Sequence, residues 1–348
     1  MNMKKMQRRS FLNSSIWLGF GGVLTGTSQK TGPALVKPRR FRKGDKVALI
    51  NPAGAIAHRM DLEIVQESLE ALGLRVKLGK HVMDRRGYLA GSDEDRAADV
   101  NRQFEDSSVT GIIAVRGGWG CARILPLLDY QLIGRNPKIL VGYSDVTALL
   151  LGIHSKTGLV TFHGPVGLGP WNSFTVEHFT KILFEGQAAE LSNPKVLDDN
   201  LTQVQNRIQT IVPGVVRGRM LGGNLTVLSA IVGSSYLPEW NDAILFLEDI
   251  QESIYRVDRM LSQLALAGIL DEISGFVFGH CTDCGPGESY GSLTIEQVLA
   301  DHVGERNLPS WRGAMIGHIS QKFTIPQGIP AEIDATTGRI QLLEAAVA

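Results

Sequence analysis

The sequence has few cysteines, no excess of either charge and, near its N-terminus, only a short apolar run. Three cysteines cannot form the disulfide framework of a small secreted protein. Lysine plus arginine and aspartate plus glutamate both total 35, so nothing indicates a nucleic-acid or anionic membrane partner. The apolar stretch Ile16 to Leu24 is too short for a transmembrane helix, which needs about 20 residues. The 348 residues, 43% of them hydrophobic and 20% charged, are typical of a soluble globular protein with room for two domains.

The first thirty residues differ in composition from the rest of the chain. They contain no acidic residue and five basic ones, Lys4, Lys5, Arg8, Arg9 and Lys30. A basic head before a short apolar run is typical of a secretory signal, and an arginine pair followed by Ser10-Phe11-Leu12 is typical of the twin-arginine type. We therefore expect residues 1–30 to direct the protein to the periplasm, without stable membrane insertion after processing. The alternative is a disordered basic tail on a cytoplasmic protein.

Short apolar runs alternate with helical spacing between residues 45 and 165. Met60 to Leu72, for example, places its apolar residues on one side of a helix. Uniformly apolar strands between helices predict a parallel sheet that is covered on both faces, and such sheets bind ligands at the carboxyl ends of their strands. The predicted strands are Val47–Ile50, Leu74–Leu78, Gly111–Val115, Ile139–Gly142 and Val160–Phe162.

The composition changes twice further along the chain. Residues 40–184 form the predicted N-terminal α/β domain, and residues 185–213, rich in Asn, Gln and Asp, are predicted to be a linker. Residues 214–348 return to strands and helices and predict a second domain of mixed sheet, which ends in a hairpin around Thr337-Gly338.

A serine stands where one predicted strand ends. Ser144 follows Ile139–Gly142, and a helix begins within three residues. The first amides of that helix, including that of Asp145, would point the positive end of the helix dipole at the serine oxygen. This arrangement suits a nucleophile that generates an oxyanion, and it also suits a plain helix cap, which is the commoner role of such a serine. The hydrolase elbow G-x-S-x-G is incomplete, because Val146 replaces its second glycine.

The glycine-rich loop after another predicted strand lies at the same edge of the sheet. Gly117 and Gly118 allow backbone amides to approach a ligand closely, which suits an oxyanion donor, a phosphate cradle or a tight turn. The loop lacks the Gly-Lys-Ser/Thr ending of a nucleotide-binding P-loop. Arg116 suits either a substrate carboxylate or a surface ion pair.

A serine nucleophile needs a base and a carboxylate to orient it. Glu248 follows the apolar run Ile244–Leu247, where a charge is costly unless it is paired. Its partner is either the base or a nearby arginine, Arg256 or Arg259. Three histidines follow apolar runs, and periodicity does not choose between them: His163, His280 and His318.

Two of the cysteines, Cys281 and Cys284, form one C-x-x-C pair. In an oxidising periplasm they could form a disulfide, and beside His280 they could form half of a zinc site. A structural zinc site needs four ligands and there is no second C-x-x-C, so we expect no metal.

Seven segments in order resemble the LD-carboxypeptidase family, the muramoyltetrapeptide carboxypeptidases of serine peptidase type. The resemblance runs from about residue 40 to the C-terminus. The segments are Asn51-Pro-Ala-Gly54, VRGGWG, VGYSDVTALL, TFHGP, MLGGNLTVLSAIVGS, LFLEDIQESIYRVDRML and IGHISQKFTIPQG.

The resemblance implies a fold, a catalytic triad and a substrate. The fold would be a flavodoxin-like parallel-sheet domain followed by a smaller β-rich domain, often in a homodimer. The triad would be Ser144, Glu248 and His318, with oxyanion donors at Asp145 and at Gly117 or Gly118. The substrate would be a murein tetrapeptide that loses its terminal D-alanine, and no cofactor or metal is implied.

Two other functions remain open at this point. One branch of the same family cleaves peptide–nucleotide antibiotics and confers immunity, using an aromatic side chain to stack on the base. Trp171 and Trp119 would be candidates for that role. A leader, two domains and a glycine-rich cleft would also suit a periplasmic ligand-binding protein without catalysis.

Overall fold

The computed structural model describes residues 32–197, 199–287 and 291–348. The predicted leader over residues 1–30 lies outside the described residues. Residues 32–348 form one compact unit. Among the described residues, none of the helices has both the length and the apolar character needed to cross a bilayer.

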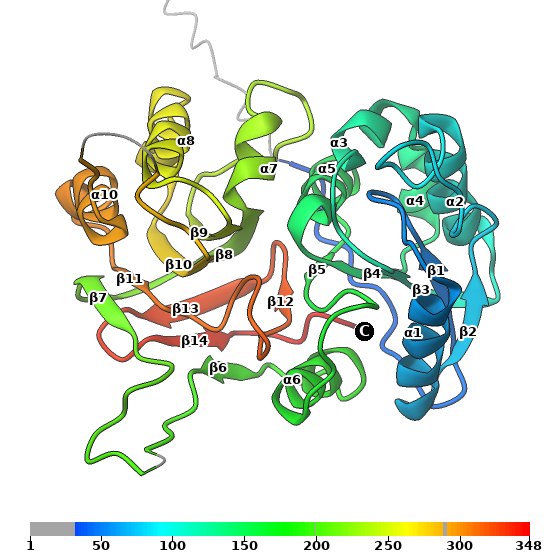
Figure 1. The fold of residues 1–348 in the computed structure, drawn as a ribbon, viewed down its shortest axis with the longest axis horizontal. Coiled ribbons are helices and arrows are strands. Elements are labelled where there is room, and N and C mark those ends of the chain that lie inside the picture. The colour runs from blue at the N-terminus through cyan, green and yellow to red at the C-terminus, as the bar shows by residue number, and fades with distance from the viewer. Residues whose placement is uncertain (1–31, 198, 288–290) are drawn as a thin grey trace, which may run out of the picture. The chain divides into compact units, whose positions relative to one another are not determined.

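Five strands from the first half of the chain and one strand from near its C-terminus form a six-stranded sheet in the order β12-β5-β4-β3-β1-β2 (Figure 1). Five of its strands are parallel, as the sequence predicts, and β12 is antiparallel to β5. The strands are β1 (Lys46–Ile50), β2 (Arg75–Leu78), β3 (Val109–Ala114), β4 (Ile139–Gly142), β5 (Phe162–His163) and β12 (Ile325–Pro326).

Both faces of this sheet are covered. Val47 and Leu49 of β1 belong to one buried apolar cluster, and Ala48 and Ile50 of the same strand belong to another. This alternation is what a strand buried on both faces requires. The helices of this half are α1 (Arg59–Ala71), α2 (Asp93–Glu105), α3 (Cys121–Ile124), α4 (Tyr130–Arg135), α5 (Thr147–Thr157) and α6 (Ser173–Leu183), with 3₁₀ turns η1 (Leu125–Leu127) and η2 (Ser144–Val146).

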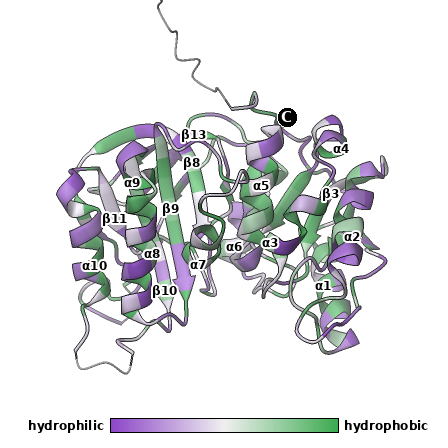
Figure 2. Ribbon diagram, turned by 90° about the horizontal axis from the view of Figure 1, so that it is seen from above, coloured by the Kyte–Doolittle hydropathy of each residue, from purple (hydrophilic) through white to green (hydrophobic). Residues whose placement is uncertain are grey.

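The second half builds an eight-stranded mixed sheet in the order β6-β14-β13-β8-β9-β10-β11-β7. Its central strands β8 to β11 are parallel, and Figure 2 shows β9 coloured hydrophobic along most of its length. The strands are β6 (Glu190–Ser192), β7 (Gln209–Val212), β8 (Val215–Asn224), β9 (Ala243–Ile250), β10 (Gly275–Thr282), β11 (Ser310–Arg312), β13 (Pro330–Asp334) and β14 (Arg339–Leu342). The helices are α7 (Leu225–Ala230), α8 (Ile254–Leu266), α9 (Ile269–Glu272) and α10 (Ile295–His302), with the 3₁₀ turn η3 (Gly304–Arg306).

The second sheet adds two strands in the segment predicted as a linker. Within residues 185–213, β6 and β7 form the two edges of the sheet. The predicted terminal hairpin is confirmed, because β13 and β14 pair antiparallel around Thr337-Gly338. The domain boundaries predicted from the sequence stay predictions.

The two sheets share their interior. Both buried apolar clusters draw residues from each half, for example Leu151 with Leu245 in one and Phe162 with Phe246 in the other. A hydrogen bond also joins them, from the backbone N–H of Asn224 to Thr147 Oγ1 at 3.0 Å. The carboxyl ends of β4 and β9 therefore belong to one packed body.

Candidate active site

Ser144 lies at a strained turn between β4 and α5. Its φ angle is 61°, in the left-handed region that costs a residue with a Cβ about 1–3 kcal/mol. The helix-cap alternative requires a side-chain bond to the start of the helix, yet Ser144 Oγ has no hydrogen-bond partner among the described residues. A strained turn that holds an unpaired hydroxyl at a strand end is the geometry of an exposed nucleophile.

The glycine-rich loop lies directly against this serine. A Cβ atom added to Gly117 would come within 2.8 Å of Ser144 Cβ and 2.9 Å of Ser144 Oγ. The same added atom would lie 3.5 Å from the backbone nitrogen of Asp145. Gly118 has a φ of 124° and packs against Gly54, where a side chain would not fit. The loop and the start of the α5 turn therefore border one small space beside the serine oxygen.

The other predicted residues of this edge hold the loop in place. The carboxylate of Asp145 is 7% exposed and accepts a hydrogen bond from the Cys121 amide at 2.8 Å. Burial raises the pKa of Asp145. Arg116 donates from Nη1 to the carbonyl of Ala55 at 3.1 Å and is half-buried. Through these bonds both ends of the glycine-rich loop are fixed next to Ser144.

Glu248 and His318 form a buried pair at the end of β9. Glu248 is 0% exposed, and its Oε2 lies 2.8 Å from His318 Nδ1. Burial alone would raise the pKa of Glu248, but the hydrogen bond and charge of His318 bring it below its ordinary value. A carboxylate on Nδ1 places the ring proton there and leaves Nε2 as the proton acceptor. Gly317, with a φ of 123°, permits this approach, because its Cβ would lie 3.0 Å from Glu248 Oε2.

Tyr143 connects the serine turn to the pair. Its ring centroid is 4.8 Å from that of His318, in an edge-to-face arrangement. The residue that precedes Ser144 therefore contacts the base candidate from the second half of the chain. The structure thus joins Glu248 to His318 directly, and it joins His318 to the serine turn through the ring of Tyr143, the residue before Ser144.

The two other candidate histidines lack a carboxylate partner. His163 is buried on β5, neither ring nitrogen has a hydrogen-bond partner among the described residues, and burial lowers its pKa to about 4. His280 on β10 also has a buried Nε2 without a partner in that part of the chain, and burial lowers its pKa. The partner of Glu248 is therefore His318 and not Arg256, which pairs with Glu252 at 3.6 Å instead.

Models of one protein family match both halves of the chain. Residues 47–164 match the N-terminal domain of LD-carboxypeptidases, and residues 217–333 match their C-terminal domain. The chain belongs to the LD-carboxypeptidase family. It is thus related to hydrolases that act on peptides.

Relatives in this family have been named for murein peptides and for immunity. The probable murein peptide carboxypeptidase of Bacillus subtilis is 36% identical over 316 residues, covering 89% of this chain and 95% of that protein. The murein tetrapeptide carboxypeptidase of Pseudomonas aeruginosa is 31% identical over 306 residues, covering 83% and 93%. The microcin C7 self-immunity protein MccF of Escherichia coli is 32% identical over 301 residues, covering 80% and 86%.

Solved structures of the family have the same two-sheet fold. Microcin C7 self-immunity protein MccF, in its wild-type apo state, superposes with a TM-score of 0.81 at 29% identity, covering 90% of this chain and 100% of that one. Muramoyltetrapeptide carboxypeptidase from Oxalobacter formigenes superposes with a TM-score of 0.72 at 29% identity, covering 85% and 97%. The fold predicted from the resemblance is confirmed.

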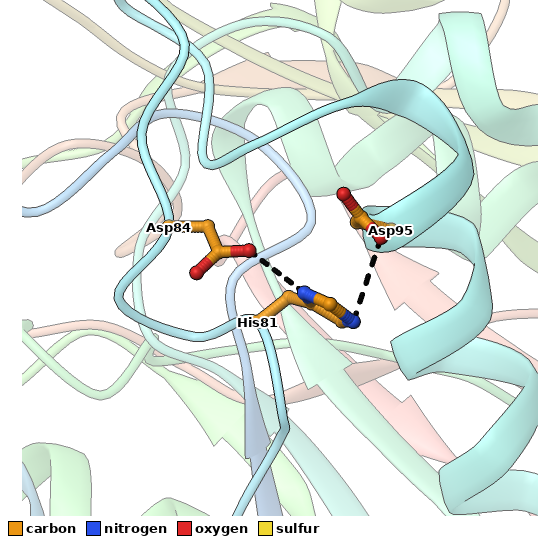
Figure 3. Close-up of side chains that lie close together, drawn as sticks. All are labelled: His81, Asp84 and Asp95. Atoms are coloured by element: carbon orange, nitrogen blue, oxygen red, sulfur yellow. Dashed lines mark hydrogen bonds and ion pairs between the residues drawn. The ribbon is translucent and has the colours of Figure 1, made fainter.

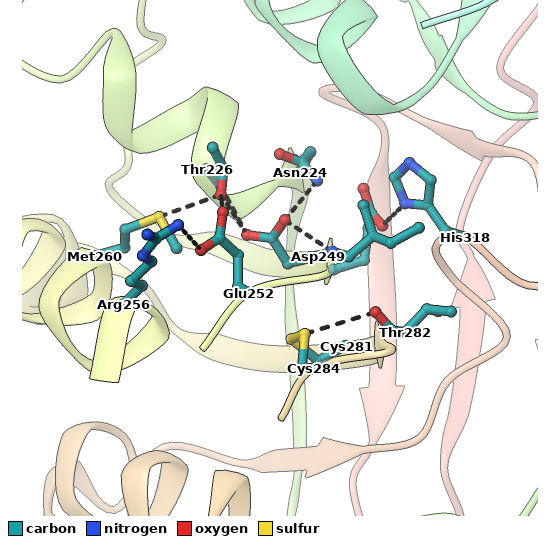
Figure 4. The surroundings of a disulfide bond; sticks show 12 residues. Asn224, Thr226, Asp249, Glu252, Arg256, Met260, Cys281, Thr282, Cys284 and His318 are labelled. Atoms are coloured by element: carbon teal, nitrogen blue, oxygen red, sulfur yellow. Dashed lines mark hydrogen bonds and ion pairs between the residues drawn. A yellow bond between two sulfur atoms is a disulfide. The ribbon is translucent and has the colours of Figure 1, made fainter. Parts of the chain in front are cut away.

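Sequence reasoning missed a polar network behind the Glu248–His318 pair. Asp249, next to Glu248, accepts hydrogen bonds from Asn224 Nδ2 at 3.0 Å and from the amide and hydroxyl of Thr226 (Figure 4). Burial raises the pKa of Asp249 to about 6. Asn224 also bonds Thr147, three residues after the serine. The network joins the end of β9 to the start of α5. In the sequence, the only sign of it is that Asp249 and Thr147 lie close to Glu248 and Ser144.

A disulfide joins Cys281, near the end of β10, to Cys284, two residues beyond the strand (Figure 4). Their sulfur atoms are therefore bonded to each other and do not form half of a zinc site with His280. Cys121 is a free, buried thiol.

One other cluster has the residue types of a metal site. His81 lies between two carboxylates, with Nδ1 2.7 Å from Asp84 and Nε2 3.5 Å from Asp95 (Figure 3). Each ring nitrogen already faces a carboxylate, and Asp95 also accepts from Ser92 Oγ at the start of α2. We interpret the cluster as an ion-paired support for that helix end.

Proposed function

We propose that this chain is a serine-type LD-carboxypeptidase that releases the terminal D-alanine from murein tetrapeptides. The observation that carries the proposal is the buried Glu248–His318 pair, which contacts Tyr143 beside the strained Ser144. The relatives named as murein peptide and murein tetrapeptide carboxypeptidases support the choice of substrate.

In the proposed reaction His318 Nε2 takes the proton of Ser144 Oγ as the oxygen attacks the scissile carbonyl carbon. The tetrahedral oxyanion accepts hydrogen bonds from the amides of Asp145 and of Gly117 or Gly118. His318 then returns the proton to the leaving amine, D-alanine departs, and an acyl-enzyme remains on Ser144. Water, activated by the same imidazole, hydrolyses the ester and restores the enzyme.

Glu248 stabilises the imidazolium that forms twice in this cycle. The carboxylate is fully buried, so its charge acts on His318 with little screening from water. Its pKa lies below the ordinary value, which keeps it ionised at neutral pH. A charge fixed in place before the reaction costs no reorganisation when the imidazolium appears.

We further propose that the enzyme acts outside the cytoplasm, where murein lies. The twin-arginine-type pattern at Arg8-Arg9 supports this location. The Cys281–Cys284 disulfide also supports it, because disulfides persist in oxidising compartments. The homodimer implied by the family resemblance is likewise proposed, and size-exclusion chromatography with light scattering would test it.

The immunity-type hydrolase is the second candidate function, favoured by the likeness to MccF. Trp171 does not support base stacking, because its indole N–H donates to the Gly167 carbonyl and its ring packs against Phe179. Trp119, on the glycine-rich loop, is 64% exposed and is the stronger candidate for a stacking surface.

The direct test incubates purified protein with murein tetrapeptide and follows D-alanine by mass spectrometry. We expect release by the parent protein and none by Ser144→Ala, while a parallel incubation with aspartyl sulfamoyl adenosine tests the immunity candidate. Release by Ser144→Ala at the parental rate would remove that serine from the mechanism. Inactivity of His163→Ala or His280→Ala, with an active His318→Ala, would overturn the choice of base.

A further inference from the structure

A buried lysine lies beside the proposed catalytic residues and takes no part in the mechanism above. Lys322 follows His318 by four residues and is 2% exposed. Its ammonium lies 4.0 Å from the centroid of the Tyr143 ring, the same ring that His318 contacts at 4.8 Å. The ammonium and the imidazole are thus neighbours around the residue that precedes Ser144.

The ammonium of Lys322 has no oxygen partner in the described part of the chain. None of its carboxylates approaches within 4.0 Å, and none of its carbonyls or hydroxyls accepts a hydrogen bond from the Nζ atom. Lys138 provides the contrast within the same protein. It is also buried, at 6% exposed, but its Nζ donates to the carbonyls of Gln103 and Asp106. Lys138 is a satisfied structural lysine, and Lys322 is not.

Leaving an ammonium buried without an acceptor is unfavourable. Burial lowers the pKa of Lys322 to about 8, although the charge of Glu248 acts in the opposite direction. The other titratable groups near it are His163, whose pKa the charge of Lys322 helps to lower, and His318, and both histidines contact the Tyr143 ring. An anionic ligand would complete the hydrogen bonds of this ammonium and offset the cost of its burial.

A carboxypeptidase substrate carries such an anion next to its reacting bond. The terminal carboxylate belongs to the residue that leaves, so it lies about 4 Å, one residue length, beyond the scissile peptide. The Lys322 ammonium and the His318 imidazole contact the same ring, at 4.0 and 4.8 Å from the centroid of Tyr143, so both lie beside the residue that precedes Ser144. We propose that Lys322 binds the terminal α-carboxylate of the peptide substrate and restricts cleavage to the last residue. This inference rests on the proposed carboxypeptidase function and names the group that recognises the chain end.

Lysine suits this role because its ammonium is a compact charge that can donate three hydrogen bonds. An internal peptide bond would place a neutral amide at the same point and leave the buried cation unpaired. The site would then reject internal bonds in the way that a polar pocket rejects a substrate that lacks its partner group.

The test compares a murein tetrapeptide that ends in free D-alanine with the same peptide ending in D-alaninamide. We expect the parent enzyme to prefer the acid by about 100-fold in kcat/KM, as is typical for losing hydrogen bonds to a buried charge. Lys322→Met should raise KM for the acid about 10- to 100-fold, with little change in kcat and little change for the amide. Lys322→Arg should restore part of the preference. Lys156→Met is the matched control, because the Lys156 ammonium also lies over a tyrosine ring, 5.1 Å from that of Tyr236, at the opposite end of α5 from Ser144. Arg116→Met tests the alternative partner for the carboxylate.

Three results would overturn the inference. Lys322→Met could keep the parental preference for the acid. It could instead lose activity on the acid and the amide by the same factor, which would mean that Lys322 acts through Glu248 and His318. Alternatively, Arg116→Met could be the variant that loses the preference. Retained hydrolysis of the amide by Lys322→Met also shows that this variant is folded.

The inference and the proposed function can fail separately. If the parent enzyme cleaves neither peptide, the proposed function fails. Calorimetric binding of the acid and amide peptides to Ser144→Ala, and to Ser144→Ala with Lys322→Met, then still tests the carboxylate contact. Equal affinity for the two peptides in both proteins would overturn it.

Discussion

The pair formed by Glu248 and His318 leads to a prediction that separates catalysis from stability. Glu248→Gln keeps the shape of the side chain but removes its charge from a position that is 0% exposed. The amide can turn either its oxygen or its nitrogen toward His318 Nδ1. With the nitrogen there, it donates where the carboxylate accepted at 2.8 Å, and the imidazole is held in the wrong tautomer.

We expect kcat to fall about 10⁴-fold in Glu248→Gln, as it does when the aspartate of a Ser-His-Asp triad becomes asparagine. That loss corresponds to about 5.5 kcal/mol of transition-state stabilisation. The free energy of unfolding should change by no more than about 1–2 kcal/mol, because the variant also removes a buried charge whose Oε1 has no hydrogen-bond partner among the described residues.

The assay follows D-alanine release under single-turnover conditions, together with urea denaturation of both proteins. Asp258→Asn is the matched control, since Asp258 forms the same type of pair with His302 Nε2 at 2.6 Å away from the proposed site. It should retain parental kcat. A Glu248→Gln enzyme within tenfold of the parent would refute the orienting and stabilising role of this carboxylate.

Three more predictions follow from the same region. Gly117→Ala should lower kcat about 10²–10³-fold, because the new Cβ would lie 2.8 Å from Ser144 Cβ and displace the proposed oxyanion donors. An unchanged steady-state kcat would contradict the placement of these donors at Gly117 and Gly118. Burial lowers the pKa of Lys322 to about 8, although the charge of Glu248 acts in the opposite direction, so the ammonium is charged below that pH. The value of kcat/KM for the acid peptide should therefore fall as pH rises through about 8. A flat profile between about pH 7 and 9.5 would contradict this prediction. Cys281→Ala should lower the free energy of unfolding by roughly 2 kcal/mol, which is the loop-closure value for so short a bridge. Urea denaturation of the variant and of the parent, with and without reductant, measures this difference. Equal stability would show that the disulfide does not contribute.

The sequence predicted the five parallel strands of the first sheet to within a few residues, and it missed the two edge strands of the second sheet. Val47–Ile50 and Ile139–Gly142 correspond closely to β1 and β4. A strand that is buried on both faces is a continuous apolar run, which can be recognised without any alternation of polar and apolar residues. Strands β6 and β7 were missed because each is a short edge. β6 pairs with β14, and β7 pairs with β11, so their partners lie more than ninety residues away in sequence.

The candidate site was predictable where its residues end strands. Ser144 and Glu248 follow apolar runs, so their place at the edge of a sheet could be inferred, although the φ of 61° at Ser144 could not. His318 could be chosen only through the family resemblance, because it lies on a loop whose course depends on Gly317. Lys322 gave no signal at all, since a lysine in a loop is ordinarily exposed.

Strand β12 has a consequence for any attempt to divide this enzyme. It comes from residues 325–326, near the C-terminus, yet it forms the edge of the sheet built by the first half and pairs with β5 (Figure 1). A gene fragment that stops after the first half would keep the pairing of β5 with β4, but it would leave the other side of β5 as an open edge and the shared apolar clusters half filled. Split reporters, fragment expression and domain exchange between relatives should therefore carry residues 325–326 with the first half, or keep the chain whole.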